Sequence, residues 1–261
     1  MIRLLPLLLL VLAGTQGFGE SHLTLRVLTY NIHHSEGTDR RLDVARVAAV
    51  IEHLQPDLVA LQEVDIGTVR ADGVDQLGEI ARLTSLHAEF GKTMDYDGGA
   101  YGDAVLSRWP IGSAHTLALP GAPDREPRAA LTVNVKPGGR WPLLQFTSTH
   151  LDQGRESENR LAQAITLNEL FATGDGPSIL AGDMNARRET DVMQALEASW
   201  TNTALVDTVP LDAQGRPRSR GDHVLVRPAQ SWRVVEWHAI DDMVTSDHRP
   251  ILVILDWLGT H

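Results

Sequence analysis

The sequence contains no cysteine, so neither a disulfide bond nor a cysteine-linked lipid can hold or anchor the chain. It also lacks an apolar run suited to crossing a bilayer: the run Leu4 to Ala13 is shorter than the roughly 20 residues that a spanning helix needs. The chain shows no internal repeat and no low-complexity tract. Its fold must therefore depend on an ordinary hydrophobic core.

Positive charge is scarce as well. The chain has 23 Lys and Arg against 34 Asp and Glu, a formal net charge of −11. Loss of residues 1–19 would remove only Arg3 and change the net charge to −12. Extensive binding to duplex phosphates is carried by Lys and Arg, so the composition argues against it. A locally positive cleft around a bound cation remains compatible with this charge.

The first residues follow the three-part pattern of a secretory signal. Arg3 precedes the apolar run Leu4 to Ala13, and small and polar residues follow up to Gly17. A short uncleaved anchor or a frayed tail is the alternative interpretation. We expect an exported protein, periplasmic or extracellular, in which residues 1–19 are removed and residues 20–261 form one domain. No Lys- and Arg-rich amphipathic helix is evident, so no stable membrane insertion is expected after removal of the signal.

Hydrophobic periodicity predicts many strands and few helices. Helices are expected at 42–54, 75–83 and 156–171. Strands are expected at 23–30, 57–64, 87–90, 104–107, 111–117, 129–135, 143–149, 178–181, 222–226, 233–237 and 251–257. The Pro- and Gly-rich segments 121–127 and 211–221 are expected to be loops. This order favours two packed β-sheets flanked by helices, because each sheet must bury one face on the other and one under helices.

Polar side chains stand where several predicted strands end. They are Asn31 in VLTYN, Glu63 in VALQEV, His150 and Asp152 in FTSTHLD, Asp183 and Asn185 in LAGDMN, and Asp247 and His248 in TSDHRP. Any one of them could be a turn cap, an ion-pair partner or a hydrogen-bonded core histidine. Together they would repel one another or stay unsatisfied without a cation or a substrate. Oxygen ligands suit Mg²⁺ or Mn²⁺ rather than zinc, which points to phosphoryl chemistry.

Six motifs in this order resemble those of the endonuclease/exonuclease/phosphatase superfamily: TYNI, LQEV, YGDAVLSRWPI, STHLD, GDMN and SDHRP. The resemblance extends from about Leu23 to Trp257. It implies an α/β fold, the four-layer αββα sandwich of two mixed sheets known as DNase I-like, and a divalent metal ion, Mg²⁺ with Mn²⁺ as an alternative. Members include secreted DNases, sphingomyelinases and inositol-polyphosphate phosphatases.

The resemblance also implies roles for single residues. The metal ligands would be Asn31, Glu63 and Asp247. Asp183 would orient or deprotonate the attacking water, and Asn185 would hold a phosphate oxygen. The histidines at the scissile phosphate would be His248, oriented by Asp222, and His150. Two substrate-binding residues are added, Tyr101 and Arg128, although a surface ion pair is an equally good interpretation of Arg128.

Three further stretches carry weaker expectations. Asp103 stands where many relatives have asparagine, so a neutral phosphate donor would be replaced by a group that repels phosphate or binds a second cation. His33 and His34 are expected to be solvated loop histidines, and a position in the pocket lining is the alternative. The segment 67–76 is expected to wall the cleft, with Arg70 as a speculative substrate contact.

The sequence thus predicts a secreted, metal-dependent phosphoester hydrolase, with a phosphodiester favoured as substrate. The substrate could be a small molecule, a lipid head group or a nucleic acid. A monomer is expected. The alternative from another functional class is a binding module that keeps the fold without the chemistry.

Overall fold

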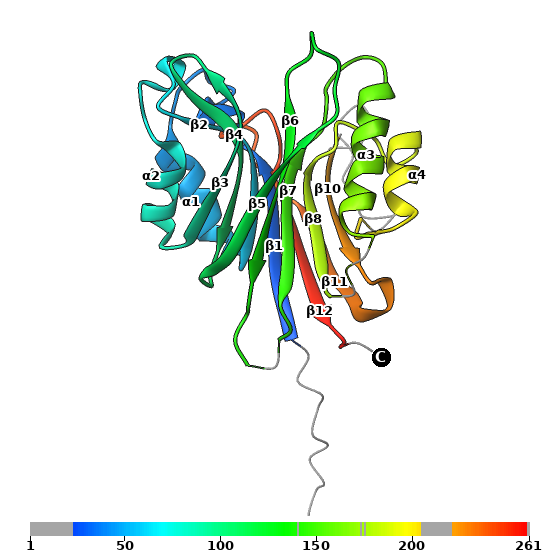
Figure 1. The fold of residues 1–261 in the computed structure, drawn as a ribbon. Coiled ribbons are helices and arrows are strands. Elements are labelled where there is room, and N and C mark those ends of the chain that lie inside the picture. Colours follow the sequence, from blue (N-terminus) through cyan, green and yellow to red (C-terminus); the bar gives the residue numbers. More distant parts are fainter. Residues whose placement is uncertain (1–22, 140, 173, 175, 205–220, 260–261) are drawn as a thin grey trace, which may run out of the picture.

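The computed structural model describes residues 23–139, 141–172, 174, 176–204 and 221–259 (Figure 1). The expected signal at 1–19 and nearly all of the expected loop at 211–221 lie outside the described residues. Among the described residues, no helix is both long and apolar enough to cross a membrane.

Two six-stranded sheets form the centre of the molecule. The first has the order β11-β12-β1-β2-β4-β3, with strands β11 (Trp232–Ala239), β12 (Ile251–Trp257), β1 (Leu23–Asn31), β2 (Leu58–Ile66), β4 (Gly99–Ser107) and β3 (His87–Tyr96). The second has the order β5-β6-β7-β8-β10-β9, with β5 (Ile111–Leu119), β6 (Arg128–Val135), β7 (Leu144–His150), β8 (Ser178–Asp183), β10 (Asp222–Arg227) and β9 (Thr201–Asn202). Both sheets are mixed, because β1 and β2 are parallel, β7 and β8 are parallel, and the other neighbours are antiparallel.

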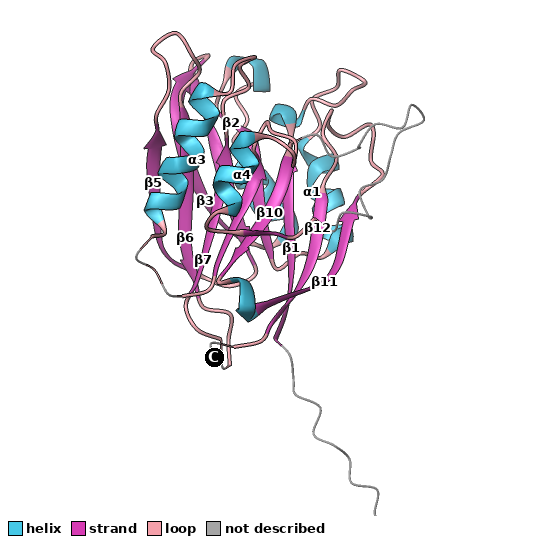
Figure 2. Ribbon diagram, turned by 90° about the vertical axis from the view of Figure 1, so that its right-hand side faces the viewer, coloured by secondary structure: helices cyan, strands magenta, loops and turns pink. Residues whose placement is uncertain are grey.

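Helices cover the outer face of each sheet. The helices α1 (Val44–Leu54) and α2 (Gln76–Thr84) lie on the first sheet, and α3 (Glu158–Leu170) and α4 (Asp191–Glu197) lie together on the second (Figure 2). Asp43 and Asp75 cap α1 and α2 by accepting hydrogen bonds from backbone N–H groups in the first turn. The arrangement is the predicted four-layer αββα sandwich, so the expected fold class is confirmed.

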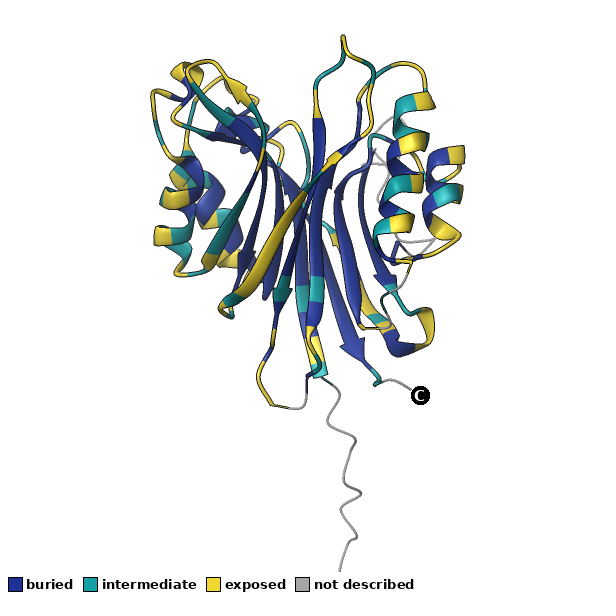
Figure 3. Ribbon diagram, viewed as in Figure 1, coloured by how far each residue is buried: buried dark blue, intermediate teal, exposed yellow. Residues whose placement is uncertain are grey.

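Strand β1 shows how the sequence generates three hydrophobic layers. Leu25 and Val27 pack between the sheets, whereas Leu28 and Tyr30 face α1 on the opposite side. Successive side chains of a strand point to opposite faces, so a strand covered on both faces is apolar almost throughout. The central strands are accordingly buried, and exposed residues gather on the helices, the loops and the edge strand β5 (Figure 3).

The structure corrects the expected bounds of two strands and adds a helix. Strands β3 and β4 extend through polar residues to a hairpin whose Asp97 and Gly98 both have positive φ, which suits a tight two-residue turn. Polar residues can form strands here because the long hairpin leaves one end of β3 exposed. Helix α4 was not expected at all, since its seven residues are too few for a clear periodic signal.

The two sheets bring the polar strand ends to one edge, the upper one in Figure 1. The parallel strands β1 and β2, and also β7 and β8, end there, and the antiparallel strands β6 and β10 begin there. In the register of the second sheet, Asp183 is the neighbour of both His150 and Asp222. The topology therefore places side chains from distant parts of the sequence side by side.

Phe146 is fully buried between the sheets, so its substitution should lower the stability of the protein strongly. Phe146→Ala removes the ring from a densely packed region, so we expect the free energy of unfolding to fall by about 3–5 kcal/mol. Urea denaturation measures this change. The control Leu143→Ala, at a position 55% exposed, should change the value by less than about 0.5 kcal/mol; equal effects would contradict the assigned core.

Candidate active site

A polar pocket of about 340 Å³ opens at this edge. Most of the residues predicted from the sequence line it, namely Glu63, Tyr101, Arg128, His150, Asp183, Asn185, Asp247 and His248. The other two, Asn31 and Asp222, are buried behind the lining and contact it through Glu63 and His248. The structure therefore brings all ten predicted residues to one place, while their individual roles stay predictions.

Asp183 occupies the centre of the pocket although it is only 1% exposed. Its Oδ1 accepts the backbone N–H of Asn185 at 2.8 Å, and its Oδ2 lies 3.5 Å from Nε2 of His150 and 3.7 Å from Nε2 of His248. Burial and the neighbouring charge of Asp222 raise the pKa of Asp183 to about 6. A carboxylate with such a pKa can accept a proton from water near neutral pH.

His248 is held between two acids. Its Nδ1 lies 3.1 Å from Oδ2 of Asp222, and its Nε2 faces Asp183. Burial alone would lower the pKa of His248, but Asp222, together with Asp183 and Asp247, outweighs it and raises the pKa to about 10. His248 is therefore an imidazolium at neutral pH, with Asp222 as its positioning residue.

His150 is in the opposite state. Its Nδ1 lies 3.0 Å from Nη1 of Arg128, and because a guanidinium can only donate, Nδ1 must be the unprotonated nitrogen. Burial and then Arg128 lower the pKa of His150 well below its ordinary value. The ring is neutral, with its proton on Nε2, and that N–H faces Asp183.

Arg128 does form the ion pair that was the alternative interpretation, but the side chain is buried and not at the surface. Its side chain is 2% exposed, and its Nη1 lies 2.8 Å from Oε1 of Glu126. Within the described part of the chain, Nε and Nη2 have no hydrogen-bond partner. Buried N–H groups are rarely left without an acceptor. Two donors of a buried guanidinium beside this pocket are suited to the oxygens of an anionic ligand.

Glu63 and Asn31 form a pair between the ends of β2 and β1. Nδ2 of Asn31 donates to Oε1 of Glu63 at 2.9 Å, and Oδ1 of Asn31 accepts the N–H of His33. The β2–β4 register shifts around Glu63, whose φ of 58° lies in the left-handed region. Such a backbone costs energy for a non-glycine residue and is kept where the surroundings require it, often at functional sites.

The loop before β12 is tied to this pair. Oγ of Ser246 donates to the backbone oxygen of Asn31 at 2.8 Å and accepts the N–H of His248. Asp247, expected as a third metal ligand, lies on this loop, is exposed and lines the pocket. Among the described residues, two groups of His, Asp and Glu have ligand atoms within 4.8 Å of one another: His33–His34–Glu63 and Asp183–Asp222–His248. Asp247 belongs to neither group.

Close packing at the end of β8 requires glycine. Gly182 has a φ of 157°, and a Cβ atom there would collide with the carbonyl oxygen of Thr149 on β7. The next residues leave the strand, and Asn185, with a φ of 46°, donates through Nδ2 to the carbonyl oxygen of Leu151. This hydrogen bond fixes the side chain of Asn185 and so sets the direction of its amide oxygen.

Asp103 differs from the charged group expected from the sequence. It is 4% exposed, and burial, with added repulsion from Glu63, raises its pKa well above the ordinary value despite Arg128. A protonated carboxyl group is neutral and can donate a hydrogen bond. Burial thus favours the neutral form of Asp103, and a neutral carboxyl group, unlike a carboxylate, would not repel phosphate.

Two other expectations are settled by the geometry. His33 lines the pocket, as the alternative interpretation had it, and His34 is only 9% exposed, so the expectation of a solvated histidine is wrong for His34. Burial lowers the pKa of His34 to about 4. Arg70 does wall the pocket, held by two hydrogen bonds to buried Asp65 and lying 4.5 Å from the ring of Tyr96.

Tyr96, Met94, Glu126 and Gln153 also line the pocket and were missed. The Asp97-Gly98 turn signal could have extended β3 as far as Tyr96. Glu126 and Gln153 belong to loops, whose position a sequence pattern does not reveal.

Comparisons with known proteins identify the family of the chain. A sequence model of the Endonuclease/Exonuclease/phosphatase family matches residues 28–248. The chain belongs to this family. The resemblance noted in the sequence is thus confirmed.

Individual relatives are distant. The chain is 26% identical to the uncharacterized protein YbhP of Escherichia coli K12, over 83% of this chain and 94% of that protein. A crystal structure of a family member from Beutenbergia cavernae has a TM-score of 0.74 and 25% identity, covering 90% of this chain and 72% of that one. A mannosyl-6-phosphatase of Bacteroides thetaiotaomicron has a TM-score of 0.69 and 19% identity, covering 88% and 99% of the two chains. At 19% identity, this last likeness concerns the fold alone.

The pair His248 and Asp222 generates a prediction about protonation. Asp222→Asn removes the acid that raises the pKa of His248, so we expect this pKa to fall from about 10 toward 6.5. An NMR titration of the imidazole resonances measures it. Because the pKa of His248 in the folded protein lies above 6.5, the charged imidazolium stabilises the fold fully below pH 6.5. This stabilisation is lost as the pH rises through about 10. In Asp222→Asn the same stabilisation should be lost at a lower pH. An unchanged pKa in Asp222→Asn would contradict the assigned pairing.

Proposed function

We propose that this protein is an exported, divalent-metal-dependent phosphoester hydrolase that cleaves a phosphodiester by direct attack of water. The observation that carries the proposal is the composition of the pocket. A buried guanidinium, two of whose nitrogens have no hydrogen-bond partner among the described residues, and an imidazolium stand next to a carboxylate whose pKa is about 6. Such a set binds an anion and accepts a proton at the same place.

The positive groups account for substrate binding. Nε and Nη2 of Arg128 would each donate to a phosphate oxygen, and the Nε2–H groups of His150 and His248 point into the same space toward Asp183. These donors are held in place before the substrate arrives, because Arg128 is fixed by Glu126 and His248 by Asp222. Donors fixed in advance stabilise the charge that develops on phosphate oxygens in the transition state.

The proton transfers follow from the pKa values. Asp183 is largely deprotonated at neutral pH and would take a proton from the attacking water. His248 keeps its proton up to a pH of about 10, so it offsets the negative charge and is the available donor for the leaving oxygen. His150 is neutral and would contribute an N–H donor without a net charge.

The oxygen atoms near Glu63 fit a divalent cation. The fit rests on hard oxygen ligands at or beside the pocket: the second oxygen of the Glu63 carboxylate, the second lone pair of the Asn31 amide oxygen and the exposed carboxylate of Asp247. When bound, Mg²⁺ or Mn²⁺ would supply positive charge for a phosphate oxygen. The fit supports the predicted set of Asn31, Glu63 and Asp247.

The size and charge of the molecule favour a small substrate or a chain end. A pocket of about 340 Å³ accommodates one phosphoester group and a small neighbour, and the net charge of −11 disfavours a long polyanion. A nucleotide is the second candidate because Tyr96, 39% exposed on the pocket wall, could stack on a base. Export rests on the N-terminal pattern of the sequence.

The test exposes the mature protein to one mixture of nucleic acid, mixed phospholipid vesicles and small phosphodiesters, first with Mg²⁺ and then with EDTA. Mass spectrometry identifies the products. Products that require the metal and are absent with Asp183→Asn would support the proposal, and their identity names the substrate class. Metal binding without any product would instead favour the binding module.

Loss of Asp183 gives the sharpest expectation for turnover. Asp183→Asn keeps the size of the side chain but cannot take the proton, so kcat should fall by about 10²–10⁴-fold with little change in KM. Steady-state kinetics on the identified substrate measure it. Glu52→Gln, a matched neutralisation of an exposed acid on α1, is the control and should leave both constants unchanged. Full activity of Asp183→Asn would refute the mechanism.

Asp103 provides a test of the neutral carboxyl group. If Asp103 is protonated, Asp103→Asn replaces one neutral hydrogen-bonding group by another, and kcat/KM at pH 7 should stay within about threefold of the original value. At higher pH, where Asp103 loses its proton, the variant should become the faster enzyme. A rise of tenfold or more at pH 7 would show that a charged Asp103 repels the substrate.

A further inference from the structure

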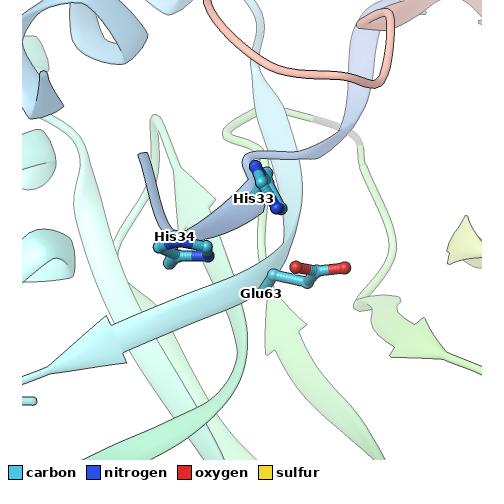
Figure 4. Close-up of side chains that lie close together, drawn as sticks. All are labelled: His33, His34 and Glu63. Atoms are coloured by element: carbon cyan, nitrogen blue, oxygen red, sulfur yellow. The ribbon is translucent and has the colours of Figure 1, made fainter. Parts of the chain in front are cut away.

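His33, His34 and Glu63 form a group that the mechanism above does not use as a whole. One ligand atom from each lies within 4.8 Å of the others. The two histidines come from the short 3-10 turn His33–Ser35 after β1, and Glu63 comes from β2. Figure 4 shows the two imidazole rings next to each other with the Glu63 side chain beside them. His33 and Glu63 line the pocket, so an ion can enter from it.

The ring of His33 is oriented like that of a metal ligand. Its Nδ1 lies 3.0 Å from the carbonyl oxygen of Glu36. A carbonyl oxygen only accepts, so Nδ1 carries the proton and Nε2 of the neutral ring keeps a lone pair. Histidines that bind metals usually donate their other ring N–H to a carbonyl or carboxylate in this way, which fixes both tautomer and orientation.

His34 supplies a second, independent observation. Its side chain is buried, and its Nδ1 has no hydrogen-bond partner in the described part of the chain. The carbonyl oxygen of His34 accepts a hydrogen bond of 2.6 Å from Nε2 of buried Gln76, which holds the residue in this inward position. A buried ring nitrogen without a partner is uncommon, and coordination of a cation would satisfy it.

The backbone around the group is held in an unfavourable conformation. His33, His34, Ser35 and Glu63 have φ values of 46°, 42°, 61° and 58°, all in the left-handed region. Three successive non-glycine residues rarely adopt it, and such strain persists where the structure must place side chains at a ligand. Asn31 joins the two parts of the group, since it accepts the N–H of His33 and donates to Glu63.

We propose that His33, His34 and Glu63 form a mixed imidazole and carboxylate site that binds a first-row transition-metal cation, such as Mn²⁺, Co²⁺ or Zn²⁺, more tightly than Mg²⁺. Imidazole nitrogens favour these ions, whereas Mg²⁺ favours oxygen ligands. This inference deepens the proposed function, because Glu63 belongs to its predicted metal set. It adds two imidazole ligands to the oxygen ligands expected from the sequence.

The test measures binding without turnover. The full chain is loaded with one equivalent of Mn²⁺, and pulsed electron paramagnetic resonance records the coupling of the ion to imidazole nitrogen. We expect nitrogen coupling that persists in a tenfold excess of Mg²⁺. His33→Asn should abolish or halve it and weaken Mn²⁺ binding by about 10- to 100-fold. Asparagine is the chosen replacement because it tolerates the left-handed backbone.

Two controls assign the signal. His115→Asn changes an exposed histidine on β5 and should leave coupling and affinity as they are. His248→Asn tests the other group, Asp183–Asp222–His248; loss of the coupling there but not in His33→Asn would overturn the proposal. Absence of nitrogen coupling in the unsubstituted protein would overturn it as well.

A folding defect does not block the test. Thermal unfolding of His33→Asn identifies one, and His34→Asn then takes its place with the same expectation. Zn²⁺ added to the unsubstituted protein provides a further reading, because the bound ring nitrogens should shift in histidine-selective ¹⁵N NMR spectra. Nitrogen coupling in a protein that hydrolyses no phosphoester would refute the proposed function while retaining this site. Hydrolysis by a protein whose bound ion has only oxygen ligands would refute this site while retaining the proposed function.

Discussion

The burial of the Asp183 carboxyl group is the constraint on which the pocket depends. A carboxylate that is 1% exposed must be compensated by nearby donors or positive charge. The compensation comes from the N–H of Asn185, the amide of Asn31 and the imidazolium of His248. Each of these groups is itself held by another contact, so the protonation states of the site follow from one set of distances.

The opposite states of the two histidines illustrate this dependence. His248 is charged because Asp222 faces its Nδ1, whereas His150 is neutral because it is buried and Arg128 donates to its Nδ1. The same residue type is thus a cation on one side of Asp183 and a neutral donor on the other. The pairing of β8 with β7 and β10 places both histidines beside Asp183.

Much of the fold could be predicted from the sequence. The limits expected for β12 match those observed, and α1 and α2 begin within two residues of their expected positions, because strong periodicity and the caps Asp43 and Asp75 mark them. The sequence did not predict the extension of β3 to Tyr96 or the helix α4. Both depend on contacts with neighbouring elements rather than on a local apolar pattern.

The sequence by itself determined the family, the four-layer fold and the chemical groups that reach the site, because six motifs and the alternation of apolar residues are local properties of the chain. Only the tertiary structure decided the state of those groups. It buried Arg128 and His34, raised the pKa of Asp103, placed His33 in the pocket lining and left Asp247 exposed. The physical reason is that charge, tautomer and ligand geometry depend on burial and on distances between residues far apart in the sequence, which no local pattern contains.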